Sequence, residues 1–131
     1  VILDAAHNPH GAASLATALE ESFTFEQIIG VVSVMADKDI LGLLQALEPV
    51  FNEIVVTWNG AARAMKSPEL AEIAIQVFGE DRVQVEANLA SAIDKAIAMA
   101  DEAGLNGVGV VVTGSVVTAA AGRALMGRVG T

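Results

Sequence analysis

Short apolar runs alternate with helical patterns along the whole chain. Residues 1–3, 28–35, 54–57 and 108–113 are almost wholly apolar, which is typical of strands that helices cover on both faces. Residues 82–86 instead alternate polar and apolar positions, which predicts a strand with one exposed face near the edge of a sheet.

Between these runs, apolar residues recur at the spacing of a helix face. In the first helical pattern they fall at Ala12, Leu15, Ala16 and Leu19, positions i, i+3, i+4 and i+7. The same spacing predicts helices over about 9–22, 40–48, 68–78, 89–103 and 116–126. Strand and helix alternate throughout, so the sequence predicts an α/β fold: a single Rossmann-like domain over residues 1–131, with a mainly parallel sheet and helices on both faces.

Capping residues stand at most of the predicted helix starts. Asn8 precedes Pro9, a proline suited to the first helical turn, and Asn88 precedes the fourth helix. Asp39 or Asp37 caps the second helix, and Ser67 is predicted as the N-cap before Pro68. Gly79 is suited to the residue that ends the third helix.

Charge and composition narrow the class of protein. The chain carries a formal net charge of −9 and only seven Lys and Arg, which form no basic stripe, so we expect no nucleic-acid partner. It has no apolar run of the ~20 residues that a membrane span needs, so we expect no membrane partner. The absence of cysteine suits the reducing cytoplasm, the expected location. Val1 stands inside a strand with no initiator Met, so we expect a piece of a longer chain.

Three loops that follow strands carry the candidate chemistry: residues 4–9, 33–39 and 113–115. Parallel strands end at one edge of a sheet, where α/β folds bind ligands, and a helix N-terminus there attracts anions. Asp4 and His7 fit such a site, but an Asx-turn and a structural histidine explain them equally well. Lys38 is explained at least as well as a solvated residue at a helix start as by a role in the site, and Ser115 at least as well as an ordinary N-cap.

Other kinds of site find little support in the sequence. No G-x-x-x-x-G-K-[ST] phosphate loop and no dinucleotide fingerprint after a strand occur. His7 and His10 are three residues apart, but no third ligand lies near them in the sequence, so we expect no metal site within this chain.

The three loops together resemble a known family. Asp4-Ala5-Ala6-His7-Asn8-Pro9 is similar to the motif that opens the C-terminal domain of the Mur ligase superfamily, with Ala5 where glycine is common. The segment S-V-M-A-D-K-D-I at 33–40 and the segment V-T-G-S at 112–115 resemble the folylpolyglutamate synthase branch.

The resemblance implies an ATP-dependent ligase that adds L-glutamate to folate or dihydropteroate through an acyl phosphate. It implies that Asp4, His7 and Asn8 bind the nucleotide and that His7, Ser115 and Lys38 serve the reaction. The phosphate loop and the Mg²⁺ ligands would lie on an N-terminal domain of the same protein, so this domain alone is expected to be inactive. The alternatives are a muramyl peptide ligase domain and a stand-alone α/β module that binds an anion.

Overall fold

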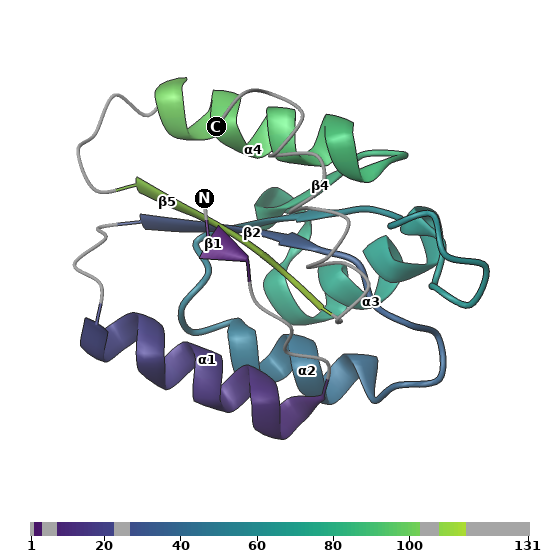
Figure 1. Cartoon of the computed structure of the whole chain (residues 1–131), viewed down its shortest axis with the longest axis horizontal. Helices are drawn as coiled ribbons and strands as arrows, with labels where there is room; N and C mark the ends of the chain where they lie inside the picture. Colours follow the sequence, from purple (N-terminus) through teal and green to yellow (C-terminus); the bar gives the residue numbers. More distant parts are fainter. Residues whose placement is uncertain (1, 4–7, 23–26, 103–107, 115–131) are drawn as a thin grey trace.

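A parallel sheet flanked by helices organises the chain (Figure 1). The computed structural model describes residues 2–3, 8–22, 27–102 and 108–114. In chain order the elements are β1 (Ile2–Leu3), α1 (Pro9–Ser22), β2 (Gln27–Val32), α2 (Ile40–Leu47), β3 (Glu53–Val56), α3 (Ser67–Phe78), η1 (Glu80–Arg82), β4 (Val83–Val85), α4 (Leu89–Glu102) and β5 (Val108–Thr113). The predicted α/β class is therefore confirmed.

The strand order of the sheet is β1-β5-β2-β3-β4, and every neighbouring pair is parallel. β4 lies at the edge, as its alternating pattern predicted. The three loops that carry the motifs follow β1, β5 and β2, which are consecutive in this order. All three loops therefore leave the same edge of the sheet side by side.

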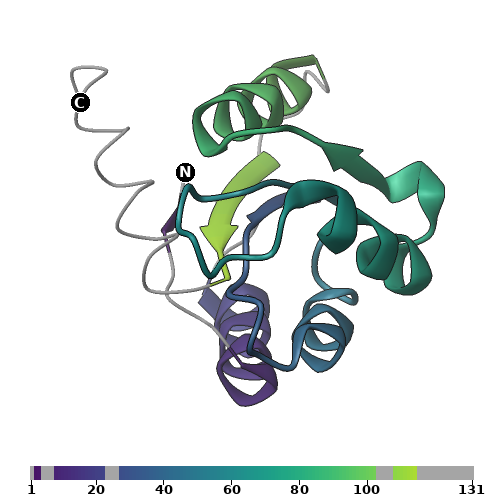
Figure 2. The same ribbon diagram turned by 90° about the vertical axis from the view of Figure 1, so that its right-hand side faces the viewer.

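Helices cover both faces of the sheet (Figures 1 and 2). One face packs on α1, α2 and α3, with Val32, Ile54 and Leu44 fully buried between them. The other face packs on α4. Val31 and Val55 belong there to a second core cluster, together with Ile93 of the helix. Successive residues of β2 thus enter opposite cores, which is why its sequence is apolar at every position except Gly30 and the first residue.

The prediction that the second strand reaches Met35 is wrong. β2 ends at Val32, and the chain then leaves the parallel ladder to meet the loop after β3. Met35 forms an isolated antiparallel bridge with Ala64, and the Met65 N–H donates to the Val34 carbonyl at 2.9 Å. The apolar run continues past the strand because Val34 is fully buried in the core that α1, α2 and α3 cover.

The strand predicted over 82–86 is shorter, because Arg82 belongs to the 3₁₀ turn η1 and β4 covers only Val83–Val85. The prediction of Ser67 as an N-cap is also wrong. The first helical hydrogen bond of α3 runs from Leu70 N–H to the Lys66 carbonyl, so Lys66 takes the cap position. Ser67 is the first helical residue and is only 7% exposed.

Two predicted helix caps are confirmed. The Asp39 carboxylate accepts from the Gly42 N–H at 3.0 Å, which decides between Asp39 and Asp37. The Asn88 side-chain oxygen accepts from the Ser91 N–H at 2.9 Å. The helix predicted over 116–126 lies outside the described residues. Within the described part of the chain, no helix is long and apolar enough to span a membrane.

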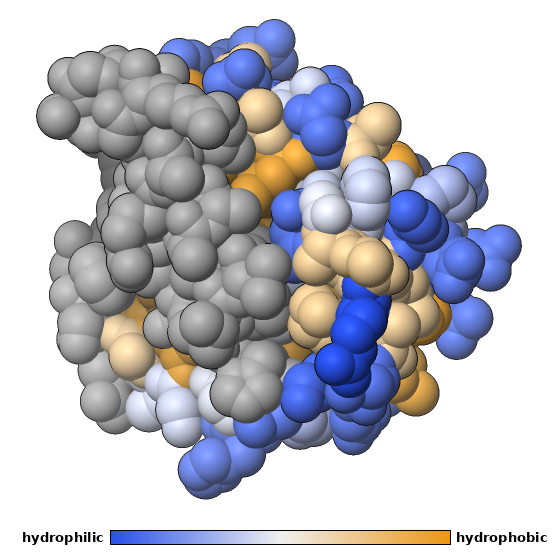
Figure 3. All heavy atoms as spheres, turned by 45° about the vertical axis from the view of Figure 1, so that its right-hand side comes forward, coloured by the Kyte–Doolittle hydropathy of each residue, from blue (hydrophilic) through white to orange (hydrophobic). Residues whose placement is uncertain are grey.

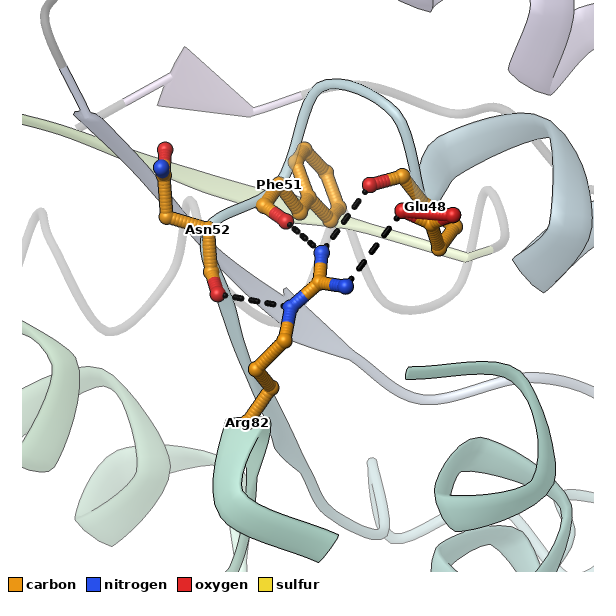
Figure 4. Close-up of polar contacts among 4 residues, drawn as sticks. All are labelled: Glu48, Phe51, Asn52 and Arg82. Carbon is orange, nitrogen blue, oxygen red and sulfur yellow. Dashed lines mark hydrogen bonds and ion pairs between the residues drawn. The ribbon is translucent and has the colours of Figure 1, made fainter. Parts of the chain in front are cut away.

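A single arginine ties together the edge of the sheet opposite the motif loops (Figure 4). Arg82 donates to three backbone carbonyl oxygens. They are those of Glu48 at 3.1 Å, Phe51 at 2.6 Å and Asn52 at 3.0 Å. Its guanidinium also meets the Glu48 carboxylate at 3.3 Å and lies over the Phe78 ring. It therefore satisfies backbone carbonyls where α2 ends and the chain turns into β3.

We expect Arg82→Ala to lower the free energy of unfolding by about 2 kcal/mol, because three carbonyls lose a charged donor. Urea denaturation of the purified chain measures this loss. Glu48→Gln is the control: the ion pair is one-third exposed and should contribute less than about 1 kcal/mol. A loss from Glu48→Gln as large as that from Arg82→Ala would contradict the assignment to the carbonyl contacts.

Candidate active site at the carboxyl edge of the sheet

The N-terminus of α1 is the first part of the candidate site. The Asn8 side-chain oxygen accepts from the Gly11 N–H at 2.7 Å, and the Asn8 carbonyl accepts from the Ala12 N–H. Asn8 is thus the predicted cap, with Pro9 as the first helical residue. Asp4 and His7, the predicted site residues just before it, lie outside the described residues. The cap fixes the position at which their loop enters the helix.

The N-termini of α1 and α2 lie against each other. A methyl group added at Gly42 would come within 2.8 Å of the Pro9 ring and 2.6 Å of the Asp39 carboxylate. The two loops with the D-A-A-H-N-P and D-K-D sequences therefore enter neighbouring helices. The positive ends of both helix dipoles face the same edge of the sheet, which favours an anionic ligand there.

Lys38 is exposed at this edge between two acidic residues that have other partners. Asp39 caps α2, and Asp37 meets Arg63 at 3.5 Å. In the part of the chain that the structure describes, no ion pair engages Lys38. Its charge is therefore exposed to solvent and available to a ligand.

The loop after β3 braces the loop that carries Lys38. The Ala36 N–H donates to the Arg63 carbonyl at 2.8 Å, next to the Met35–Ala64 bridge. The sequence alone did not indicate this contact, since pairing between two loops leaves no periodic signal. Figure 2 views the sheet from the edge where these loops lie.

Trp58 makes two contacts within the loop after β3. Its indole N–H donates to the Ala61 carbonyl at 2.9 Å, and the Lys66 ammonium lies 3.6 Å from the centroid of its ring. The Asn59 side chain accepts from the Ala61 N–H at 2.9 Å, which closes the turn. The loop is therefore held by its own side chains as well as by its neighbour.

The loops after β2 and β5 are in direct contact. The Ser33 N–H donates to the Thr113 carbonyl at 3.4 Å, and Gly114 has a φ of +123°. A methyl group at Gly114 would overlap the Ser33 carbonyl. The predicted site residue Ser115 lies outside the described residues, but the strand and glycine that lead to it are packed against the start of the 33–39 loop.

Two buried hydroxyls mark the same edge. Thr57 follows β3 and Thr113 ends β5. Both residues are 0% exposed, and their side-chain hydroxyls have no hydrogen-bond partner within the described residues. A buried hydroxyl without a partner costs about 1–3 kcal/mol. Neither residue was singled out from the sequence alone, although Thr113 lies in the V-T-G-S segment.

The described residues do not form a metal site by themselves. No group of three or more His, Asp or Glu side chains that could hold an ion occurs among them. The described residues thus form an α/β domain with a parallel sheet, and its carboxyl edge, where open α/β sheets bind ligands, carries two adjoining helix N-termini, an exposed lysine and a glycine turn.

Comparison with known proteins identifies the family. The family model described as "Mur ligase, glutamate ligase domain" matches residues 1–116. The chain therefore belongs to this family, and its resemblance to the C-terminal domain of the Mur ligases is confirmed.

Proteins named as folylpolyglutamate synthases or dihydrofolate synthases are similar to this chain. The dihydrofolate synthase/folylpolyglutamate synthase of Mycobacterium tuberculosis is 48% identical over 98% of this chain and 28% of its own length. A crystal structure of the M. tuberculosis folylpolyglutamate synthase complexed with ADP and AMPPCP has a TM-score of 0.93, with 51% identity over 95% of this chain and 29% of that one. A bifunctional enzyme structure with Mn, AMPPNP and L-glutamate bound has a TM-score of 0.77, with 26% identity over 95% of this chain.

This chain thus spans 28% of the length of the curated M. tuberculosis relative. The two structures described above hold nucleotides, and the second of them also holds Mn. Those ligands are bound by proteins more than three times as long as this chain, which covers 29% and 28% of them.

Proposed function

We propose that this chain is the C-terminal domain of a cytoplasmic, ATP-dependent ligase that adds L-glutamate to folate, and to dihydropteroate where the enzyme is bifunctional. The observation that carries the proposal is the strand order β1-β5-β2, which gathers the three motif loops on adjacent strands. The family match and the folate-specific relatives support the folate branch over a muramyl ligase or a stand-alone module.

The proposed reaction has two steps. The γ-phosphoryl group of ATP passes to a carboxylate oxygen of the folate or dihydropteroate, giving an acyl phosphate and ADP. The amine of L-glutamate then attacks the acyl carbon, the C–O bond to phosphate breaks, and the amine loses a proton as the amide forms. Several anions must meet in this reaction, so positioning and electrostatic preorganisation supply most of the rate.

The roles that we assign to this chain follow from its position. Asp4 and His7 precede the α1 N-terminus, where Asp4 would contact ATP, and His7 would donate to a phosphate oxygen or to the incoming glutamate. Asn8 would support the nucleotide contact by holding the helix start. Lys38 would offset the negative charge of the reactants, and Ser115, directly after Gly114, would bind glutamate.

Mg²⁺ would screen the phosphate charge in this reaction. The described residues lack a suitable set of ligands, so we assign the ion and the phosphate loop to an N-terminal domain of the same protein. We accordingly expect this chain to be inactive by itself.

The proposal is tested by ATP-dependent glutamylation with the full-length protein. The assay compares tetrahydrofolate and dihydropteroate with a muramyl peptide precursor and follows both ADP release and the new amide by mass spectrometry. Glutamylation of a folate substrate supports the proposal, whereas ligation of only the muramyl substrate would overturn it.

In that enzyme, His7→Ala should reduce kcat/KM about 10²-fold, because a preorganised donor at the developing charge is lost. His10→Ala is the matched control, since His10 is an exposed histidine on α1 three residues later and should leave kcat/KM unchanged. Steady-state kinetics measure the change in kcat/KM for both variants, and a melting curve for each shows whether the fold is retained. Near-normal kinetics for His7→Ala, or a loss matched by unfolding, would make His7 a structural residue.

A further inference from the structure

Positive charge gathers on two neighbouring loops of an acidic chain. The chain has a formal charge of −9 and seven Lys and Arg in all. Three of the seven lie on the loops 33–39 and 57–66, namely Lys38, Arg63 and Lys66. The same two loops contain only two acidic residues, Asp37 and Asp39. These two loops are therefore a locally cationic surface at the edge where the proposed reaction takes place.

The acidic residues of this surface are already engaged. Asp39 caps α2 and Asp37 meets Arg63. The Arg63 side chain nevertheless remains 78% exposed, so most of its five N–H donors face solvent. Lys66 is exposed as well, and its ammonium lies over the Trp58 ring. This contact with the ring face uses none of the ammonium N–H groups as hydrogen-bond donors, so they can still donate to a carboxylate.

The backbone that carries Arg63 and Lys66 is also held in place. Ala36 bonds to the Arg63 backbone at 2.8 Å, and Met65, next to Lys66, bonds to Val34 at 2.9 Å. Two cationic side chains on a braced loop suit a ligand that carries anionic groups at intervals, because the loop backbone needs no further ordering on binding. Figure 3 brings part of this edge forward and shows a strongly hydrophilic stripe among paler side chains.

We propose that Arg63 and Lys66 form a subsite for the α-carboxylates of the γ-linked glutamate tail of the folate substrate. The inference rests on the proposed function. Each added glutamate contributes one free carboxylate to the tail. The 57–66 loop follows β3, one strand spacing of about 4.8 Å beyond the β2 loop that carries Lys38, so a tail extending from the reacting end can pass over it. The pair would therefore make affinity increase with tail length.

The test uses the full-length ligase with folates that carry one or four glutamates. For Arg63→Gln combined with Lys66→Gln, we expect KM for the tetraglutamate to rise about 3- to 10-fold, because exposed charge pairs contribute modestly and add. KM for the monoglutamate and kcat for both substrates should stay within about twofold. Raising the ionic strength to about 0.5 M should remove the effect, since it screens exposed charges.

Three further variants sharpen the test. Lys95→Gln removes the same charge from the exposed surface of α4 and should change neither KM. Arg63→Lys and Lys66→Arg keep the charge and should retain most of the preference for the longer tail. Equal KM changes for the two substrates, or none for the tetraglutamate, would overturn the subsite while leaving the proposed function intact. A wild-type enzyme that glutamylates neither folate would overturn both.

Discussion

Replacing Gly114 by alanine is expected to lower the free energy of unfolding by about 4 kcal/mol, the largest single loss that we predict. Gly114 has a φ of +123°, a region that side chains other than glycine adopt only with strain. Its added methyl group would also overlap the Ser33 carbonyl. Backbone cannot rotate away as a flexible side chain can, so the β5 and β2 loops would have to separate.

Gly60 provides the matched control for this prediction. It has a φ of +90° in the loop after β3, and an added methyl group there would meet nothing within 4 Å. Gly60→Ala therefore isolates the conformational penalty, about 1–2 kcal/mol. Urea denaturation of both variants separates strain from steric overlap. Equal losses at the two positions would show that the Ser33 contact contributes nothing.

The consequence for function follows from the position of the contact. Gly114 connects β5 to Ser115, and Ser33 opens the loop that carries Lys38, so the contact sets the spacing of two proposed site residues. The Gly114→Ala enzyme should accordingly lose activity even at a temperature at which it remains folded.

The sequence predicted most of the fold because this fold is periodic. The apolar runs located β1, β2, β3 and β5, the alternating pattern located β4, and the caps Asn8, Asp39 and Asn88 marked three helix starts. The extent of β2 was overestimated because Val34, beyond the end of the strand, is buried in the same core and is therefore apolar as well. Ser67 was misassigned because Pro68 fits the first two helical positions equally well.

The arrangement of the site was less predictable, because adjacency in a sheet is a long-range property. The sequence indicated that three loops share an edge, but only pairing showed that β5 lies between β1 and β2. The contributions of Arg63, Trp58 and Lys66 could not be predicted, since they arise where one loop pairs with another. Asp4, His7 and Ser115 lie outside the described residues, so their roles remain predictions from the resemblance.

Gly30 gives the second large effect, in the core rather than at the site. It faces the core under α1, α2 and α3, where a methyl group would overlap the ring of Phe51, a side chain only 1% exposed. Closely packed interiors do not absorb added volume without shifting neighbours. We expect Gly30→Ala to cost about 3 kcal/mol, measured by urea denaturation, because the ring must be displaced from a filled core.

A double-mutant cycle attributes that cost to the ring. Phe51→Leu alone should lose about 1–2 kcal/mol through the cavity that it creates. In the Gly30→Ala/Phe51→Leu variant the smaller side chain leaves room for the new methyl group, so the combined loss should be at least 1 kcal/mol less than the sum. Losses that add within about 0.5 kcal/mol would show that the two positions are independent. Coupling would instead establish that β2 has a glycine at this position because the turn between α2 and β3 places an aromatic ring over it.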